Sequence, residues 1–330
     1  KAVTYPGFSR DIVSFGLVEN ISVNDGQVAI RIKVTTGDET IPQQIKSSVD
    51  NVLEQLEGVS GFSTEVIVER PKGSAAAGKQ PGSLPGVRKI VAVASGKGGV
   101  GKSVMSRLLA QYHIDRDMPF RAYDADASHG AMLRYYAEFS EPIDIASFES
   151  LDRVVENTLE SEQTAIVDLA AQATRALDRW AGESGVLELA GETGLGLTLW
   201  HIMDDGSDSL MLLERLLAAY GEGPDYVLVR NHGRGSDFSL FEQSEVAHAA
   251  QAAGARVMDL PALHAPTMRK IDHISASFWA AANNRDASLG PTLGILERQR
   301  VRTWINRSYE QLDRALLKSR TEAEQTDTPE

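Results

Sequence analysis

The sequence contains no cysteine among its 330 residues. Disulfides, thiol nucleophiles and metal or cluster sites built from thiolates are therefore excluded within these residues. No apolar run approaches the roughly 18 residues that suggest a membrane span, and the first residues, KAVTYPGFSRDIVSFG, lack the long apolar core of a signal peptide. Basic residues are too few to balance the acids, and the net charge is −13. We expect a cytoplasmic protein that is poorly suited to non-specific DNA binding, although a local basic patch could still bind DNA.

Composition divides the chain into two unequal parts. Residues 71–86 are rich in proline, glycine, serine and alanine and show no apolar periodicity, which predicts a flexible linker. The linker separates a small domain, residues 1–70, from a large domain, residues 87–320. The last ten residues, 321–330, are polar and acidic, which predicts a disordered tail.

The small domain combines strand and helix patterns. Alternating apolar residues from Val28 to Val34 predict a half-buried strand, and the NDG sequence at 24–26 predicts a hairpin turn before it. Apolar residues at helical spacing between Ile45 and Leu56 predict a helix. The sequence TEVIVE at 64–69 then predicts another strand. The small domain is therefore expected to be α+β, and it shows no obvious catalytic cluster.

The large domain alternates predicted strands with helical patterns. The expected strands are residues 89–94, 120–125, 164–169, 196–202, 225–231 and 255–261, and residues 209–220 are one of the expected helices. Alternation of this kind predicts an α/β domain with a mostly parallel sheet covered on both faces. Ligands of such sheets usually bind at the carboxyl ends of the strands.

A phosphate-binding loop follows the first of these strands. Residues 96–103, GKGGVGKS, fit the pattern G-x-x-x-x-G-K-[ST] between a predicted strand and a predicted helix. Lys102 is expected to reach the β- and γ-phosphates, and the Ser103 hydroxyl to bind Mg²⁺. A flexible glycine turn is the alternative, and the strand, helix, lysine and serine together argue against it. The residues expected to bind nucleotide here are Gly96, Lys97, Gly98, Gly99, Val100, Gly101, Lys102 and Ser103.

The second lysine of the loop, Lys97, narrows the class of P-loop protein. The sequence KGGVGKS resembles the deviant Walker A motif of the Mrp/ParA/MinD group of P-loop ATPases. In that group the extra lysine, here Lys97, crosses a dimer interface and contacts the nucleotide of the partner. The resemblance therefore implies a homodimer across the nucleotide, in which Lys97 acts as an arginine finger does. The alternative is a solvated loop lysine.

Further residues match the same group. Asp124 and Asp126 resemble its D-x-D motif, in which the first aspartate supports hydrated Mg²⁺ and the second orients the attacking water. An aspartate pair after a strand is also typical of a helix cap. Asp168 stands where a Walker B aspartate binds Mg²⁺ through water. Asn231 stands where the group has an asparagine that hydrogen-bonds adenine, although asparagine is common in turns too.

The order of small domain, linker and P-loop resembles Mrp/ApbC-type iron–sulfur cluster carriers over roughly the first 130 residues. Three departures limit this resemblance. After Asp168 the chain reads LAAQATRA instead of a Pro-Pro-Gly stretch, the paired C-x-x-C that holds the carriers' cluster is absent, and TTGDETIP at 35–42 lacks the cysteine often found there. The C-terminal half more faintly resembles TraL-like ATPases of plasmid transfer and other ParA relatives.

These features predict a dimeric switch that binds ATP and Mg²⁺, engages a partner or cargo in its ATP state, and hydrolyses ATP slowly until the partner stimulates it. One alternative is an iron–sulfur cluster assembly factor that acts without cysteine ligands of its own and holds no conventional cluster. The other is a nucleotide-gated scaffold that hydrolyses weakly. The client or cargo is not identified by the sequence.

Two features lie outside these motifs. Residues 295–320 predict an amphipathic helix whose first half carries Arg298, Arg300, Arg302 and Arg307. Such a helix either packs on its own sheet or binds a membrane, and we favour packing. His129 and His232 follow motif strands, but no histidine spacing predicts a zinc site, so loop or surface roles are expected.

Overall fold

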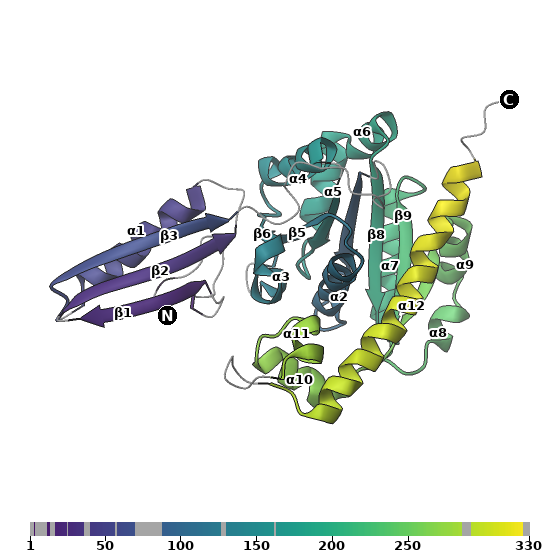
Figure 1. Cartoon of the computed structure of the whole chain (residues 1–330). Helices are drawn as coiled ribbons and strands as arrows, with labels where there is room; N and C mark the ends of the chain where they lie inside the picture. Colours follow the sequence, from purple (N-terminus) through teal and green to yellow (C-terminus); the bar gives the residue numbers. More distant parts are fainter. Residues whose placement is uncertain are drawn as a thin grey trace.

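The computed structural model describes residues 3, 12–13, 17–24, 26–35, 40–56, 58–69, 88–126, 130–161, 163–285 and 292–325. The chain forms a small sheet-and-helix unit at the N-terminal end and a larger α/β unit (Figure 1). The predicted linker at 71–86 lies outside the described residues, and so does His129.

The small unit is a three-stranded mixed sheet with one helix. It contains β1 (Val18–Asn24), β2 (Gln27–Thr35), α1 (Thr40–Glu54) and β3 (Gly61–Glu69), with strand order β1-β2-β3. β1 is antiparallel to β2, and β3 is parallel to it. Ile45, Val49 and Leu53 of α1 are buried in the hydrophobic core of this unit, as the helical spacing predicted.

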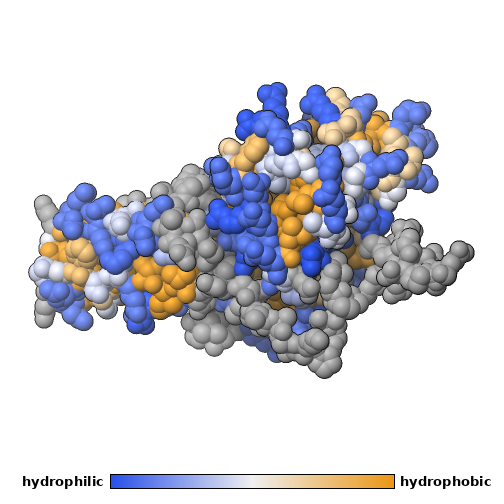
Figure 2. All heavy atoms as spheres, turned by 90° about the horizontal axis from the view of Figure 1, so that it is seen from above, coloured by the Kyte–Doolittle hydropathy of each residue, from blue (hydrophilic) through white to orange (hydrophobic). Residues whose placement is uncertain are grey.

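Part of the apolar interior of the small unit remains open. A cavity of 510 Å³ lies among aliphatic side chains from β1, β2, α1 and the segments beside them. Ile21, Val23 and Leu56 line this cavity and are more than half exposed. Apolar side chains therefore reach the surface of the small unit as well as that of the larger one (Figure 2).

The larger unit is a seven-stranded sheet with helices on both faces. Its strand order is β10-β9-β8-β4-β7-β5-β6, and each neighbouring pair is parallel. This confirms the predicted fold class, α/β with a parallel sheet preceded by a small α+β domain. Its elements are β4 (Lys89–Ala94), α2 (Lys102–Asp115), β5 (Phe120–Asp124), α3 (Ala131–Tyr135), η1 (Ala137–Phe139), β6 (Ser140–Pro142), α4 (Phe148–Ser161), β7 (Thr164–Asp168), α5 (Thr174–Ser184), α6 (Val186–Thr193), β8 (Gly196–Met203), α7 (Ser207–Tyr220), β9 (Asp225–Asn231), α8 (Ser239–Glu242), α9 (Glu245–Ala252), β10 (Arg256–Leu260), α10 (Ala265–His273), α11 (Phe278–Asn283) and α12 (Ile295–Gln325).

The two faces of the sheet have separate cores. Val91 and Val93 of β4 pack in one hydrophobic cluster, with α2 and α12, whereas Ile90 and Ala92 pack in the other, with α4 and α7. The alternation follows because successive side chains of a strand point to opposite faces. The edge strand β6 was not predicted, because three residues are too few to show a pattern.

The C-terminal helix α12 packs against the larger unit. Val301, Trp304 and Leu312 are buried in the first of these clusters, and the Trp304 Nε1 donates a hydrogen bond to the Pro261 carbonyl at 2.7 Å. The structure therefore supports the packing alternative for this helix. α12 continues to Gln325, so residues 321–325 are helical where the sequence predicted disorder, and residues 326–330 lie outside the described part. No helix within the described residues has the length and apolarity needed to cross a bilayer.

The two units touch through α3. Leu133 of this helix is buried in the hydrophobic cluster of the small unit, whereas its neighbour Met132 is buried in the core of the larger unit. α3 therefore belongs to both cores.

Candidate nucleotide site

The predicted site residues converge at one edge of the larger sheet. β4 lies between β7 and β8, and the P-loop leaves its carboxyl end. Val93 pairs with Asp168 on β7, and Asp168 pairs in turn with Asp124 on β5. Asn231 ends β9 on the other side. Because parallel strands present their carboxyl ends at the same edge, the motifs meet there as expected.

At two positions of the P-loop, both the backbone conformation and the available space favour glycine. Gly96 has a φ of +61°, and a Cβ there would lie 2.5 Å from Leu212 Cδ2. Gly101 precedes α2 with a φ of +101°, and a Cβ there would lie 2.3 Å from Asn231 Nδ2. A side chain would therefore meet both strain and collision at these positions. The resulting turn places the N-terminus of α2, with its unpaired N–H groups, at the loop.

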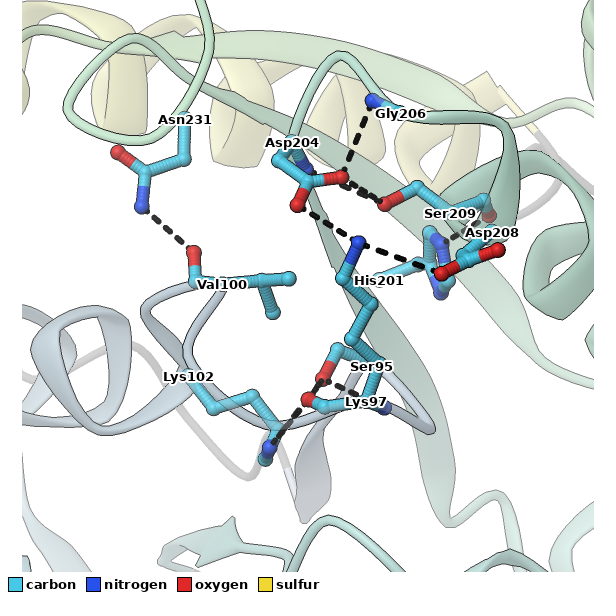
Figure 3. A network of polar contacts seen from close by, with 10 residues as sticks. All are labelled: Ser95, Lys97, Val100, Lys102, His201, Asp204, Gly206, Asp208, Ser209 and Asn231. Atoms are coloured by element: carbon cyan, nitrogen blue, oxygen red, sulfur yellow. Dashed lines mark hydrogen bonds and ion pairs between the residues drawn. The ribbon is translucent and has the colours of Figure 1, made fainter.

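Lys102 lies inside this loop. Its Nζ donates to Ser95 Oγ at 3.2 Å and to the Lys97 carbonyl at 3.1 Å (Figure 3). The side chain is buried, which lowers the pKa of Lys102, while nearby Asp168 and Asp126 act to raise it. Lys102 is therefore a cation held by loop oxygens at the position where the motif predicts phosphate.

Asp168 is a buried carboxylate without hydrogen-bond donors of normal geometry. It is 1% exposed, and within the described part of the chain neither of its oxygens accepts a hydrogen bond. Burial raises the pKa of Asp168 to about 6, although the nearby hydroxyls of Ser103 and Ser106 and the Lys102 ammonium lower it. A buried carboxylate is stable only when its charge is compensated. The unsatisfied oxygens beside Ser103 therefore fit a divalent cation bound at this point.

The two aspartates after β5 differ in their surroundings. Asp124 is fully buried and accepts hydrogen bonds from the backbone N–H groups of Met132 at 2.7 Å, Leu133 at 3.3 Å and Asp126 at 3.1 Å. Burial and the charge of Asp168 nevertheless raise the pKa of Asp124 well above its ordinary value. Asp126 is partly exposed and close enough to Lys102 and Asp168 to affect their pKa values. Asp124 is thus fixed by the backbone, and Asp126 lies nearer the solvent.

Asn231 connects the P-loop to the loop after β9. Its Nδ2 donates to the Val100 carbonyl at 2.7 Å (Figure 3), and its Oδ1 accepts from the Gly233 N–H at 3.0 Å. The resemblance implied a contact to adenine. That contact stays a prediction, and the structure shows that Asn231 contacts the backbone of the P-loop.

Lys97 points toward α7 of its own chain. Its Nζ forms an ion pair with Asp204 Oδ2 at 2.8 Å and lies 3.8 Å from Asp208 Oδ2 (Figure 3). Sequence reasoning missed Asp204, although a carboxylate directly after a predicted strand was a usable signal. It also missed Ser95 and the buried His201, whose Nε2 lies 3.1 Å from the Ser209 carbonyl oxygen and whose pKa burial lowers to about 4.

The remaining histidine and metal predictions have simple outcomes. His232 Nε2 lies 2.7 Å from Asp259 Oδ1 on β10, and the ring packs against Phe238, which directly precedes α8. Within the described ranges no group of three or more histidine, aspartate or glutamate residues is arranged to hold a metal by itself. Magnesium usually keeps water and substrate phosphates among its ligands, so Ser103 and Asp168 need not form a complete protein cage.

The family model matches only the small unit of the chain. Residues 1–63 match the family described as iron–sulfur cluster assembly protein. An iron–sulfur cluster carrier protein of Helicobacter pylori is 31% identical over 126 residues, which cover 38% of this chain and 34% of the relative. The chain therefore matches about a third of the length of that carrier.

Other similarities extend over more of the chain at lower identity. Protein TraL of Escherichia coli is 24% identical over 240 residues, covering 69% of this chain and 99% of TraL. Among solved structures, the MinD cell division protein of Aquifex aeolicus aligns with a TM-score of 0.39 and 11% identity over 66% of this chain and 96% of that one. The family match of the small domain, the carrier relatives and the P-loop with its parallel sheet fit a Mrp-type P-loop ATPase of the ParA/MinD group.

Proposed function

We propose that this chain is an ATP-binding and ATP-hydrolysing factor of the iron–sulfur assembly type, which serves a client protein and holds no cluster on thiolates of its own. The assembly part of the proposal is supported by the family match over residues 1–63 and by the carrier relatives. The nucleotide part is carried by one observation. The buried carboxylate of Asp168 accepts no hydrogen bond of normal geometry from the described residues, and it lies at the P-loop near Lys102 and Ser103.

The residues at the sheet edge have separable tasks in ATP hydrolysis. The P-loop N–H groups and Lys102 bind the phosphates. Ser103 and Asp168 would hold Mg²⁺, which would supply positive charge to the phosphates, and Asp124 would support its hydration shell. Asp126, at the solvent side, orients the attacking water. The resemblance to the Mrp/ParA/MinD group leads us to expect slow hydrolysis that a partner stimulates. The sequence LAAQATRA after Asp168 leaves open a scaffold that hydrolyses weakly.

The cluster is cargo in this proposal. These 330 residues offer no thiolate, so the cysteine ligands belong to the donor and the acceptor. The small domain contacts the client, and the nucleotide state of the larger unit regulates this contact. Leu133 and Asp124 provide the connection between the units, because the Leu133 side chain lies in the small-domain core while its N–H binds the Asp124 carboxylate. We propose a cytoplasmic location for this activity, where ATP and Mg²⁺ are available.

A second candidate function is a dimeric switch for another cargo, and the second lysine of the P-loop favours it. In that case two copies pair across the nucleotides, and the ATP state binds the cargo directly. A scaffold that binds ATP and scarcely hydrolyses it is the third possibility.

Cluster transfer separates these functions. The experiment measures [4Fe–4S] acquisition by an apoferredoxin from a cluster donor, with and without this protein and ATP·Mg²⁺, together with phosphate release. Faster acquisition that requires ATP, without iron or sulfide remaining on this protein, supports assembly. ATP hydrolysis without any effect on acquisition contradicts assembly and supports the switch. Binding of ATP without phosphate release supports the scaffold.

A further inference from the structure

The extra lysine of the P-loop is held within its own chain. Lys97 Nζ lies 2.8 Å from Asp204 Oδ2, and the two side chains are 28% and 18% exposed. The second carboxylate, Asp208, lies 3.8 Å away and is 63% exposed. The pKa of Lys97 is raised, chiefly by the hydrogen bond to Asp204. The ammonium is therefore charged and engaged at the start of α7 (Figure 3).

Asp204 is itself fixed as an acceptor. Its Oδ1 accepts from Ser209 Oγ at 2.7 Å and from the Gly206 N–H at 3.2 Å, which leaves Oδ2 for Lys97. Burial opposes ionisation of Asp204, but the bonds from Lys97 and Ser209 outweigh it and lower the pKa of this carboxyl. The contact is thus built from both sides and does not depend on one mobile pair.

This arrangement places Asp204 in competition with phosphate. β8 is adjacent to β4 in the sheet, so the carboxylate after β8 lies beside the loop after β4. An ammonium that is turned toward α7 of its own chain is not extended away from that chain. To contact a nucleotide phosphate, Lys97 must exchange one oxygen for another.

We propose that Asp204 restrains Lys97 in the nucleotide-free protein, and that pairing of two copies with ATP moves the Lys97 ammonium from Asp204 to a nucleotide phosphate; this inference rests on the ATP-dependent pairing of the second candidate function. A partly exposed ion pair contributes little stability, whereas a triphosphate carries several charges. The contact between Lys97 and Asp204 therefore raises the nucleotide concentration needed for pairing but does not prevent pairing.

The first test uses Asp204→Asn, which keeps the size of the side chain and removes its charge. Light scattering measures pairing against the concentration of ATPγS with Mg²⁺. Half-maximal pairing is expected at about two- to fivefold lower nucleotide than in the parent protein, as loss of one partly exposed ion pair allows. Asp208→Asn is the matched control, and because Asp208 is farther away and more exposed, its shift is expected to be smaller. An unchanged or higher requirement for nucleotide in Asp204→Asn would overturn the restraint.

The second test needs no nucleotide. Acetylation of Lys97 by acetic anhydride at pH 9, followed by peptide mass spectrometry, reports how available the neutral amine is. Asp204→Asn is expected to raise this rate about two- to fivefold relative to Lys46 in the same sample. An equal rate in both proteins would refute the contact itself. Failure of the parent protein to bind ATP, with the labelling difference present, would refute the proposed function and leave the contact established.

A double variant tests whether Asp204 acts through Lys97. Lys97→Ala/Asp204→Asn should pair no more readily than Lys97→Ala alone, because the restraint has nothing to hold. A gain of pairing in the double variant over Lys97→Ala would show that Asp204 acts through another group, and the proposal would be wrong.

Discussion

Asp168 and Asp124 lie directly opposite each other on the parallel strands β7 and β5, and both are buried. Their environments are unequal. Asp124 accepts three backbone hydrogen bonds, whereas Asp168 accepts none of normal geometry from the described residues. Two neighbouring buried carboxylates repel each other, so this arrangement is unfavourable until a cation is bound. We infer that the two carboxylates lower the stability of the unliganded protein and are present because they bind a cation.

This cost predicts a stabilised variant. Asp168→Asn removes one buried charge and keeps the side-chain shape, so the free energy of unfolding without Mg²⁺ or nucleotide should rise by roughly 2 kcal/mol at pH 7.5. Hydrolysis of ATP should be lost in the same variant. Urea denaturation with EDTA and a phosphate-release assay measure the two effects. Glu160→Gln, which removes an exposed carboxylate on α4, should change neither.

The stability gained in Asp168→Asn should depend on pH. The pKa of Asp168 is raised from 3.8 to about 6 in the folded chain, so the folded state binds this proton more tightly than the unfolded state. Its favourable contribution is complete below pH 3.8 and is lost as the pH rises through 6. Asp168→Asn should therefore differ little from the parent protein at pH 4 and should reach its full advantage above pH 6.5. An advantage of equal size at pH 4 would show that the charge is not its cause.

Lys102→Ala is expected to abolish nucleotide binding. The ammonium is the cation closest to the centre of the P-loop network, with Ser95 Oγ and the Lys97 carbonyl as its present partners. Charge-assisted bonds to phosphate are strong, so affinity for ATP should fall at least about 100-fold by calorimetry. Lys46→Ala, an exposed lysine paired with Asp50 in the small unit, is the control. Unchanged ATP affinity in Lys102→Ala would refute the assignment of the P-loop.

Asn231→Ala distinguishes two roles of one side chain. If Asn231 holds the P-loop through Val100, its loss should lower the affinities for ATP and for inorganic triphosphate by a similar factor, about tenfold. If it only reads adenine, the affinity for inorganic triphosphate should not change. We expect the first result, because the contact to Val100 is present without any base. His232→Ala, at the next position, should change neither affinity, since its partner is Asp259.

The sequence predicted those parts of the site that local spacing determines. The P-loop, the D-x-D pair and Asp168 each lie at the carboxyl end of a strand, and the parallel sheet brings such positions to one edge. Asp204 also follows a strand, but its partner could not be assigned in this way. Its pairing with Lys97 depends on β8 lying next to β4, which is a contact between strands more than 100 residues apart. Strand order of this kind is set by the packing of the whole domain.

The contact between the two units was also not predictable. α3 has only five residues, too few for a helical pattern, and its two adjacent apolar residues enter different cores. Sequence spacing therefore gave no reason to connect the small domain with Asp124. The function of the small domain, its client and the pairing of two copies stay predictions.

Lys97→Ala is expected to bind ATP but to lose both ATP hydrolysis and ATP-dependent pairing. Lys102, Ser103 and the backbone donors of the loop remain, so ATP affinity should stay within about threefold of the parent protein. Hydrolysis and ATP-dependent pairing should fall together, because the missing charge is the one expected to span two copies. Contacts of the arginine-finger type are worth roughly 10³–10⁵ in rate, so even slow turnover should become undetectable.

Asp126→Ala should separate the two steps that Lys97→Ala loses together. It keeps the charge of Lys97 and removes the carboxylate expected to orient water, so the variant should pair with ATP and Mg²⁺ and remain paired. Light scattering and phosphate release on both variants give the comparison. We expect Asp126→Ala to pair without hydrolysing ATP and Lys97→Ala to do neither. This result would assign the lysine to formation of the paired state and the aspartate to the chemical step. If Lys97→Ala pairs and hydrolyses like the parent protein, the lysine is only a loop residue bound to Asp204, and the resemblance to the deviant Walker A group does not extend to its mechanism.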